Sequence, residues 1–305
     1  MKYAKDPLSF EGQADLLLQR GLCADRQQLV ERLQTTNYYR LSSYLFTFRE
    51  TPELYRKGTS LEAAWALYRF DHFLRLLLLD AIETIEVHVR TQLAYHFAHA
   101  HGAFSYLAPH LFPNFASERS DFEKWERKLR EQVKRGRQKK GREDFIVHFF
   151  KKYGDTHDMP PIWMLVELMD FGSTLSFFRG VSVEIRRKVA ETLGQPEEVV
   201  LSWLLALNSI RNRCAHHARL WNWRVGYPVL IPNARKFPKW HSPRLPNDQM
   251  GIILMICNYW LERANPHHYW KSRVESVFCD FPGIEHHLMG LPTEWTRLPL
   301  WVDPK

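Results

Sequence analysis

Apolar residues recur at intervals of three and four through most of the chain, and this spacing is typical of amphipathic helices. The longest such segment, residues 60–101, contains neither glycine nor proline. At 1.5 Å per residue it would extend about 60 Å as a single helix, so it is either one long helix or two helices in tandem. Arg75, Glu83, Glu86 and Arg90 interrupt its apolar positions, which excludes a membrane-spanning helix.

Shorter helical patterns follow, bounded by proline, glycine and capping signals. They predict helices at about residues 161–178, 183–193, 197–223 and 250–263. Before the long segment, two short helical patterns are joined at Gly21, with Asp25 as an N-cap, and an aromatic-rich stretch comes after them. Runs that alternate between apolar and polar residues are nearly absent, so we expect an all-α fold with minor strand content.

These patterns divide the chain into three predicted parts. We expect a small N-terminal helical subdomain in residues 1–55, a helical bundle in residues 56–230, and a C-terminal helical extension that packs on the bundle in residues 231–305. The extension is rich in proline and tryptophan and shows one clear helical pattern. Hydrophobic residues make up 45% of the 305 positions, which is enough to build a substantial core.

Cysteine usage and the N-terminal sequence exclude several classes of protein. Cys23, Cys214, Cys257 and Cys279 lie far apart and form no C-x-x-C pair, which argues against a disulfide framework and a cysteine-rich zinc site. The N-terminal residues lack the apolar core of a secretory signal, and no stretch of 18 residues is apolar throughout. We therefore expect a cytoplasmic protein with no membrane association, no cofactor and no metal.

Basic residues are concentrated in one segment of the chain. Residues 119–152 hold 13 Lys/Arg and 6 Asp/Glu, a net charge of +7 in a chain whose net charge is +8. Such a cluster attracts phosphates through counterion release, although a solvated, mobile loop between helices would have the same composition. The candidate RNA-binding residues at its centre are Lys134, Arg135, Arg137, Lys139, Lys140 and Arg142.

The aromatic stretch of the N-terminal part is a second candidate for contact with RNA. Tyr38, Tyr39 and Tyr44 are interleaved with Arg40, and this arrangement can stack on bases. Aromatic side chains of this kind more often pack a small domain against a larger one. The sequence leaves both interpretations open.

The segment "SIRNRCAHHARLWNW", residues 209–223, carries the candidate catalytic residues Arg211, Asn212 and His216. Other arginine–histidine pairs at a similar spacing lack an asparagine directly after the arginine. Such a set could cleave RNA without a metal. Histidine can take a proton from the ribose 2′-OH or give one to the departing 5′ oxygen, arginine can neutralise charge on the phosphorus, and asparagine can orient either group.

Helical geometry raises a difficulty for this site. At about 100° per residue, Arg211 and His216 in one regular helix would point about 140° apart. Either Arg211 lies in an irregular turn, or a second copy of the chain completes the site. A symmetric dimer would also supply an acid and a base from two His216 side chains, unless His217 is the second group. We assign Arg213 and His217, expected on one helix face, and Arg219 to support or substrate contact.

Three other interpretations of the segment are open. His216, His217 and a remote carboxylate could hold a metal, although neighbouring histidines on a helix diverge. Cys214 could be a nucleophile activated by His217, although nothing nearby marks an acyl or phosphoryl pocket. The segment could also be a capping and salt-bridging surface without any catalytic role.

Four longer motifs carry a resemblance to a known family. They are "NYYRLSSYLFTF", "YRFDHFLRLLLLDAIETIEVHVRTQLAYHFA", "EDFIVHFFKKYGDTHDMPPIWMLVELMDFGSTLSFF" and "LNSIRNRCAHHARLWN". In these motifs, which span most of its length, the chain resembles the Abi-like (AbiD/AbiF) family of bacterial abortive-infection proteins, whose members carry a HEPN domain. The resemblance implies a HEPN-type helical bundle.

The same resemblance implies an activity and partners. It maps the family's R-N-x-x-x-H element onto Arg211, Asn212 and His216, and it implies a metal-independent endoribonuclease that works as a homodimer. Such a protein is a toxin against phage infection or part of a toxin–antitoxin pair. Its partners would be RNA as substrate and either a small structured regulatory RNA, bound by residues 119–152, or a protein antitoxin. Some HEPN proteins bind RNA or partner proteins without cutting, so a non-catalytic helical module is the alternative.

Overall fold

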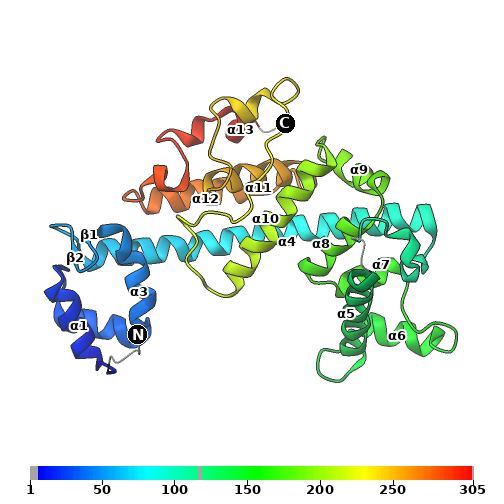
Figure 1. Cartoon of the computed structure of the whole chain (residues 1–305), viewed down its shortest axis with the longest axis horizontal. Coiled ribbons are helices and arrows are strands. Elements are labelled where there is room, and N and C mark those ends of the chain that lie inside the picture. The colour runs from blue at the N-terminus through cyan, green and yellow to red at the C-terminus, as the bar shows by residue number, and fades with distance from the viewer. Residues whose placement is uncertain (1–5, 116–118, 304–305) are drawn as a thin grey trace.

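The computed structural model describes residues 6–115 and 119–303, and nearly all of its regular structure is helical. This confirms the all-α fold. One long helix, α4 (Leu61–His101), runs through the whole molecule, and the other elements pack along it (Figure 1). The outer ends of the first and last predicted parts, residues 1–5 and 304–305, lie outside the described residues.

Helix α4 is a single helix of 41 residues, which decides between the two predicted alternatives. The Ser60 side chain caps its start by accepting a hydrogen bond from the Ala63 N–H (3.1 Å), and Gly102, at φ 96°, follows its end. Between these two residues nothing in the sequence breaks the hydrogen-bond ladder. None of the described helices combines the length and the apolar character that crossing a membrane requires.

The N-terminal part contains α1 (Phe10–Gln19), α2 (Arg26–Thr35), α3 (Tyr38–Leu45), and a short antiparallel hairpin, β1 (Arg49–Thr51) and β2 (Leu54–Tyr55). Gly21, at φ 89°, and the Asp25 carboxylate, which accepts from the Gln28 N–H at 2.8 Å, confirm the predicted turn and cap. The third helix, α3, was not predicted. Most of the buried apolar side chains of this part form a hydrophobic cluster of their own, which includes Leu61 and Ala64 of α4, whereas Tyr44 belongs to the main core.

The middle of the chain corrects two predictions. It contains α5 (Arg119–Arg137), α6 (Asp144–Tyr153), α7 (Ile162–Leu165), α8 (Phe171–Gly180), α9 (Val183–Glu191) and α10 (Glu197–Ala215). The basic segment is therefore mostly helical, and only residues 138–143 form a loop between helices. The helix predicted over residues 161–178 is interrupted, because the Asp170 carboxylate caps α8 at the Ser173 N–H (2.8 Å) and Arg90 of α4 donates to the Met169 carbonyl.

The C-terminal part contains more helix than the sequence indicates. The predicted α11 (Met250–Ala264) is present, and α12 (Trp270–Asp280) and α13 (Pro299–Val302) follow it. Every residue of α11 from Met250 to Leu261 is buried, because the helix lies against α4 on one side and α13 on another. The 3₁₀ turns are η1 (Phe46–Phe48), η2 (Ser105–Leu107), η3 (Pro109–Leu111), η4 (Val166–Leu168), η5 (Pro238–His241), η6 (His286–Met289) and η7 (Trp295–Arg297).

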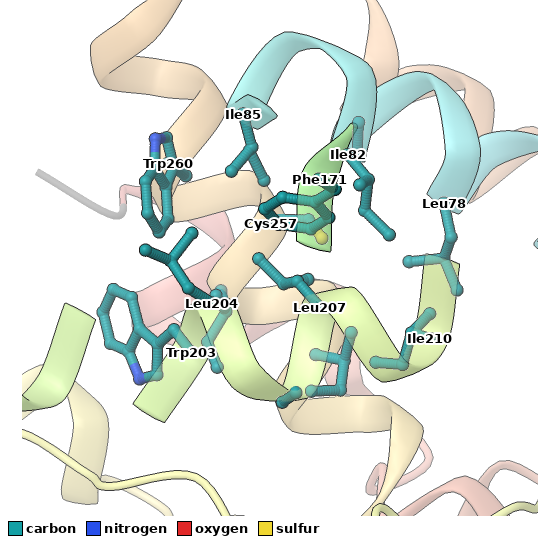
Figure 2. Close-up of a cluster of buried hydrophobic side chains, with 14 of the residues drawn as sticks. Leu78, Ile82, Ile85, Phe171, Trp203, Leu204, Leu207, Ile210, Cys257 and Trp260 are labelled. Carbon is teal, nitrogen blue, oxygen red and sulfur yellow. The ribbon is translucent and has the colours of Figure 1, made fainter. Parts of the chain in front are cut away.

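The main hydrophobic core lies where α4, α10 and α11 meet (Figure 2). Each aliphatic side chain buried there contributes about 1.5–3 kcal/mol relative to exposure. This core holds α10 across the middle of α4 and so fixes where α10 ends. Its members include Leu78, Ile82, Ile85, Phe171, Trp203, Leu204, Leu207, Ile210, Cys257 and Trp260.

Candidate functional site

The predicted catalytic residues lie where α10 ends. Arg211 and Asn212 are in the last turns of α10, and His216 is its C-cap, with φ −92° and ψ 12°. The helix therefore stops at Ala215 and does not reach residue 223 as predicted. Arg211 is in regular helix, so the irregular turn considered for it is wrong, and the backbone leaves helical geometry only at His216 and His217. We refer to Arg211, Asn212 and His216 together as the α10 motif.

The chain leaves α10 through a tight turn at His217. This residue has φ 55° and is the one non-glycine residue with positive φ in residues 6–115 and 119–303. The Ala218 N–H donates to the Arg213 carbonyl (2.9 Å) and the His217 N–H to the Cys214 carbonyl (3.0 Å). These are the two bonds of a Schellman motif, which usually has glycine at this position. Left-handed geometry costs a non-glycine residue roughly 1–2 kcal/mol and persists only where the surroundings impose it.

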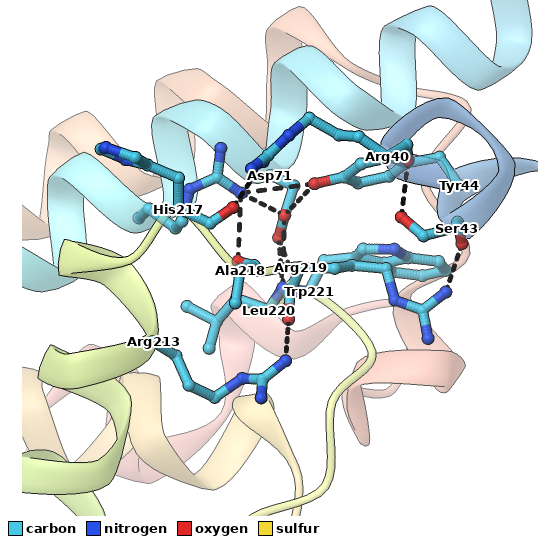
Figure 3. A network of polar contacts seen from close by, with 11 residues as sticks. Arg40, Ser43, Tyr44, Asp71, Arg213, His217, Ala218, Arg219, Leu220 and Trp221 are labelled. Carbon is cyan, nitrogen blue, oxygen red and sulfur yellow. Dashed lines mark hydrogen bonds and ion pairs between the residues drawn. The ribbon is translucent and has the colours of Figure 1, made fainter. Parts of the chain in front are cut away.

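A buried carboxylate of α4 provides part of that constraint (Figure 3). Asp71, with 0% of its surface exposed, accepts hydrogen bonds from the N–H groups of Leu220 (3.1 Å) and Trp221 (2.6 Å). It also accepts from the Tyr44 hydroxyl (2.6 Å) and from Arg75, one turn further along α4. Burial raises the pKa of the Asp71 carboxyl, and the Arg75 charge and these hydrogen bonds oppose that rise. Asp71 thus fixes the backbone of residues 217–221, which we call the site loop.

Arginines from three helices hold the other end of the site loop. Arg40 of α3 donates to the carbonyl of residue 217 (2.6 Å), Arg75 of α4 to that of residue 218 (3.4 Å), and Arg213 of α10 to that of residue 219 (2.7 Å). A guanidinium carries several N–H donors in a fixed plane and no acceptor, so it suits a row of backbone carbonyls. The site loop is therefore attached to all three helices at once.

The three residues predicted to support the site have different environments. Arg213 also lies with its guanidinium 4.3 Å from the centre of the Trp223 ring, and Arg219 donates to the Ser43 carbonyl of α3. His217 lies beyond the helix end, so the expectation that it shares a helix face with Arg213 is wrong. The His217 ring is exposed and makes no hydrogen bond to another described residue. Arg213 and Arg219 thus shape the site loop, whereas the His217 side chain is directed to solvent.

The side chains of the α10 motif reach the surface. Asn212 and His216 are exposed and Arg211 is partly exposed, with its guanidinium donating to the Asn212 side-chain oxygen at 3.1 Å. Within residues 6–115 and 119–303 the His216 ring makes no hydrogen bond or ion pair. His216 can therefore meet a substrate or a second chain. On α4, burial raises the pKa of Glu86, and the charges of Arg90, its ion-pair partner, and of Arg211 oppose that rise.

Cys214 is not a reactive thiol. It is buried in the core, and burial raises its pKa to about 12, so the thiolate that nucleophilic catalysis requires is scarce at neutral pH. This argues against the cysteine interpretation of the segment. The described residues hold no group of three or more His, Cys, Asp or Glu side chains arranged to bind a metal.

The six predicted RNA-binding residues form a basic surface, the basic tip, where α5 is joined to α6. All six are exposed. Arg142 pairs with Asp144 (2.8 Å) and Arg137 lies over the Phe150 ring (4.2 Å), whereas the other four form no ion pair with a described residue. The structure does not join the basic tip to the α10 motif, because α5 packs mainly against α6, α8 and η4, towards the C-terminal end of α4 (Figure 1).

Sequence reasoning missed the residues that shape the site loop. Asp71 and Arg75 stand four apart in a largely apolar helical stretch, "YRFDHFLRLLLL", which also contains Arg69 and His72. An opposite-charge pair at that spacing among apolar positions indicates a structural ion pair, and this signal was available. The bond from Arg40 to the His217 carbonyl joins residues 177 positions apart, and no local pattern indicates it.

Comparison with known proteins gives one match. A family model described as "Abi-like protein" matches residues 31–222, more than half of the chain, and the matched span runs from α2 past the α10 motif and the site loop. Neither the curated proteins nor the solved structures contain a significant match.

Proposed function

Because the chain belongs to the Abi-like protein family, we propose that it is a metal-independent endoribonuclease of the HEPN type that acts in abortive-infection defence against phage. The observation that carries this proposal is the position of Arg211, Asn212 and His216 at the solvent-facing end of α10. Arg40, Arg213 and Arg219 surround the same loop, and their charge suits a polyanionic substrate.

The proposed reaction uses the ribose 2′ oxygen as the nucleophile. An imidazole takes the 2′-OH proton, the 2′ oxygen bonds to phosphorus, the bond from phosphorus to the 5′ oxygen breaks, and an imidazolium returns a proton to that oxygen. Arg211 neutralises charge that develops on the phosphoryl oxygens. His216, which has no partner among the described residues, is free to make these transfers. Asn212, hydrogen-bonded to Arg211, holds the guanidinium.

Cleavage of purified RNA tests this proposal directly. Incubation in EDTA is expected to give fragments with 2′,3′-cyclic phosphate and 5′-OH ends, and a 2′-O-methyl group at the cut site is expected to block the reaction. A requirement for Mg²⁺, or 5′-phosphate ends, would contradict the mechanism. RNA binding without any cleavage would assign the chain to the alternative class, the non-catalytic RNA-binding or partner-binding helical modules.

We expect a two-fold homodimer with the ends of its α10 helices near the axis. One histidine cannot hold the acidic and the basic form at the same moment, so a second His216 from another copy would complete the pair. The exposed position of the His216 ring leaves room for this. Light scattering at micromolar concentration is expected to give the dimer mass. A purely monomeric protein with full RNase activity would overturn this prediction and leave His217 as the second group.

The basic tip is expected to bind RNA phosphates, either of the substrate or of a structured regulatory RNA. Replacement of its six basic residues by glutamine should weaken binding and flatten the dependence of log K on log salt, by about 0.7 for each lost contact to a single strand. Stability should change little, because all six side chains are exposed. The matched control replaces Arg235, Lys236 and Arg244, which are exposed in the C-terminal part. An unchanged slope in the basic-tip variant would assign these charges to solubility.

A further inference from the structure

The aromatic stretch of α3 separates into two environments. Tyr44 is buried and donates to Asp71, and the half-buried Tyr38 accepts a hydrogen bond from Arg20 at 3.0 Å. Both therefore have packing roles. Tyr39, in contrast, is 74% exposed, and Phe46, one residue past the end of α3, is 59% exposed. Neither ring contributes to the core, and the packing interpretation leaves both unexplained.

Tyr39 and Phe46 lie on one face of the same helical segment. They are seven residues apart, and Phe46 continues α3 with αR geometry, so two turns bring both side chains to the same side, roughly 10 Å apart along the axis. The Arg49 guanidinium lies 5.5 Å from the centre of the Phe46 ring. Tyr39 meets the edge of Tyr38 at a centroid distance of 5.5 Å, which holds the Tyr39 ring while leaving most of it in solvent.

The helix that carries this face, α3, is joined to the site loop at two points. Arg40, next to Tyr39, donates to the His217 carbonyl at 2.6 Å. Ser43, which lies between Tyr39 and Phe46 in the helix, provides the carbonyl that accepts from Arg219. Tyr39 is therefore the neighbour in sequence of Arg40, which bonds directly to the site loop, and their Cα atoms are about 3.8 Å apart.

We propose that Tyr39 and Phe46 form a stacking surface for the bases of single-stranded RNA that enters the site; this inference rests on the proposed function. Every base has a π-face, so aromatic rings bind single strands with little dependence on sequence. The only charged side chains from Tyr38 to Arg49 are Arg40 and Arg49, and both are basic. Exposed rings flanked by positive charge match a strand with stacked bases and a phosphate backbone, and paired bases would be inaccessible to them.

The test measures RNA affinity in a His216→Ala background, so that the full-length protein binds without cutting. Tyr39→Ala and Phe46→Ala should each weaken binding of a short single-stranded RNA roughly tenfold or more. The salt slope should stay unchanged, because neither ring carries charge. Tyr39→Phe and Phe46→Tyr, which keep a ring, should restore affinity. Tyr269→Ala, which removes a tyrosine that is 81% exposed elsewhere, is the matched control and should have no effect.

Duplex RNA, made by annealing the same RNA to its complement, should bind the His216→Ala protein with equal affinity whether or not it also carries Tyr39→Ala. Unchanged single-strand affinity in both alanine variants, or an equal loss for duplex RNA, would overturn the proposal and leave this face to a protein partner. Cleavage by the protein with its own His216 is measured separately. If that protein does not cut RNA, the ribonuclease proposal fails, while the binding comparison still decides whether Tyr39 and Phe46 hold a single strand.

Discussion

Replacement of His216 by alanine is expected to lower RNA cleavage by about 10²–10⁴-fold, the usual contribution of a general acid or base. Arg211→Ala should cost about 10²–10³-fold, because it removes a charge-stabilising donor. Asn212→Ala should cost less than either, since its side chain acts on Arg211 and not on the substrate. Single-turnover cleavage rates measure these effects, and RNA affinity should change far less than the rate.

His217→Ala is the matched control for this experiment. It removes an exposed imidazole at the next position and tests whether the loss of any imidazole at this site lowers cleavage. If only His216→Ala is inactive, the acid and the base come from two copies of that residue. If both variants are inactive, one chain supplies both groups and dimerisation is not needed for the chemistry. Activity like that of the unchanged protein in His216→Ala would reduce the α10 motif to a solvated helix end.

Asp71→Ala is expected to lower the free energy of unfolding by about 3–5 kcal/mol, because it leaves the buried Arg75 charge without its counter-ion. It also removes the acceptor for the Leu220 and Trp221 N–H groups and the Tyr44 hydroxyl. Urea unfolding measures the loss. Cleavage should fall further than the unfolded fraction explains, since the site loop would lose its anchor on α4.

Asp80→Ala on the same helix provides the control. Asp80 pairs with Arg273 at 2.8 Å, but both side chains are about half exposed, and such surface pairs contribute about 0–1 kcal/mol. The two variants therefore remove the same side chain from a buried and from an exposed ion pair. If Asp71→Ala were no more destabilising than Asp80→Ala, Asp71 would not have the structural role assigned to it.

Local sequence signals predicted the helix ends that are set by residues within the neighbouring turn. The helical character of residues 60–101 follows from apolar spacing without glycine or proline, although the sequence left open whether they form one helix or two; the ends of α4 are set by Ser60 and Gly102. The starts of α9, α10 and α11 were predicted at the residues where they occur. At α4 and α9 a serine side chain caps the first turn, and at α10 Pro196 stands directly before it, so the sequence contains these signals.

The end of α10 could not be predicted in the same way. No glycine marks the turn, because His217 occupies the left-handed position. The forces that impose this geometry come from Asp71 and Arg40, which lie about 150 and 177 residues away in the chain. The α10 motif was therefore identified by residue type and spacing. Its exposure and the arginines that hold the site loop came only from the tertiary structure.

The continuity of α4 fixes the spacing between the two ends of the molecule that carry the proposed surfaces. Helix α3 is joined to α4 near Asp71 through Tyr44, and the segment between η4 and α8, against which α5 packs, is joined to α4 near Arg90 through Met169. Nineteen residues of uninterrupted helix separate these two points by about 30 Å. Stacked nucleotides advance about 3.4 Å each, so roughly nine nucleotides with stacked bases would cover that separation. Because α4 has no break, the two ends cannot approach each other to accommodate a shorter stacked strand.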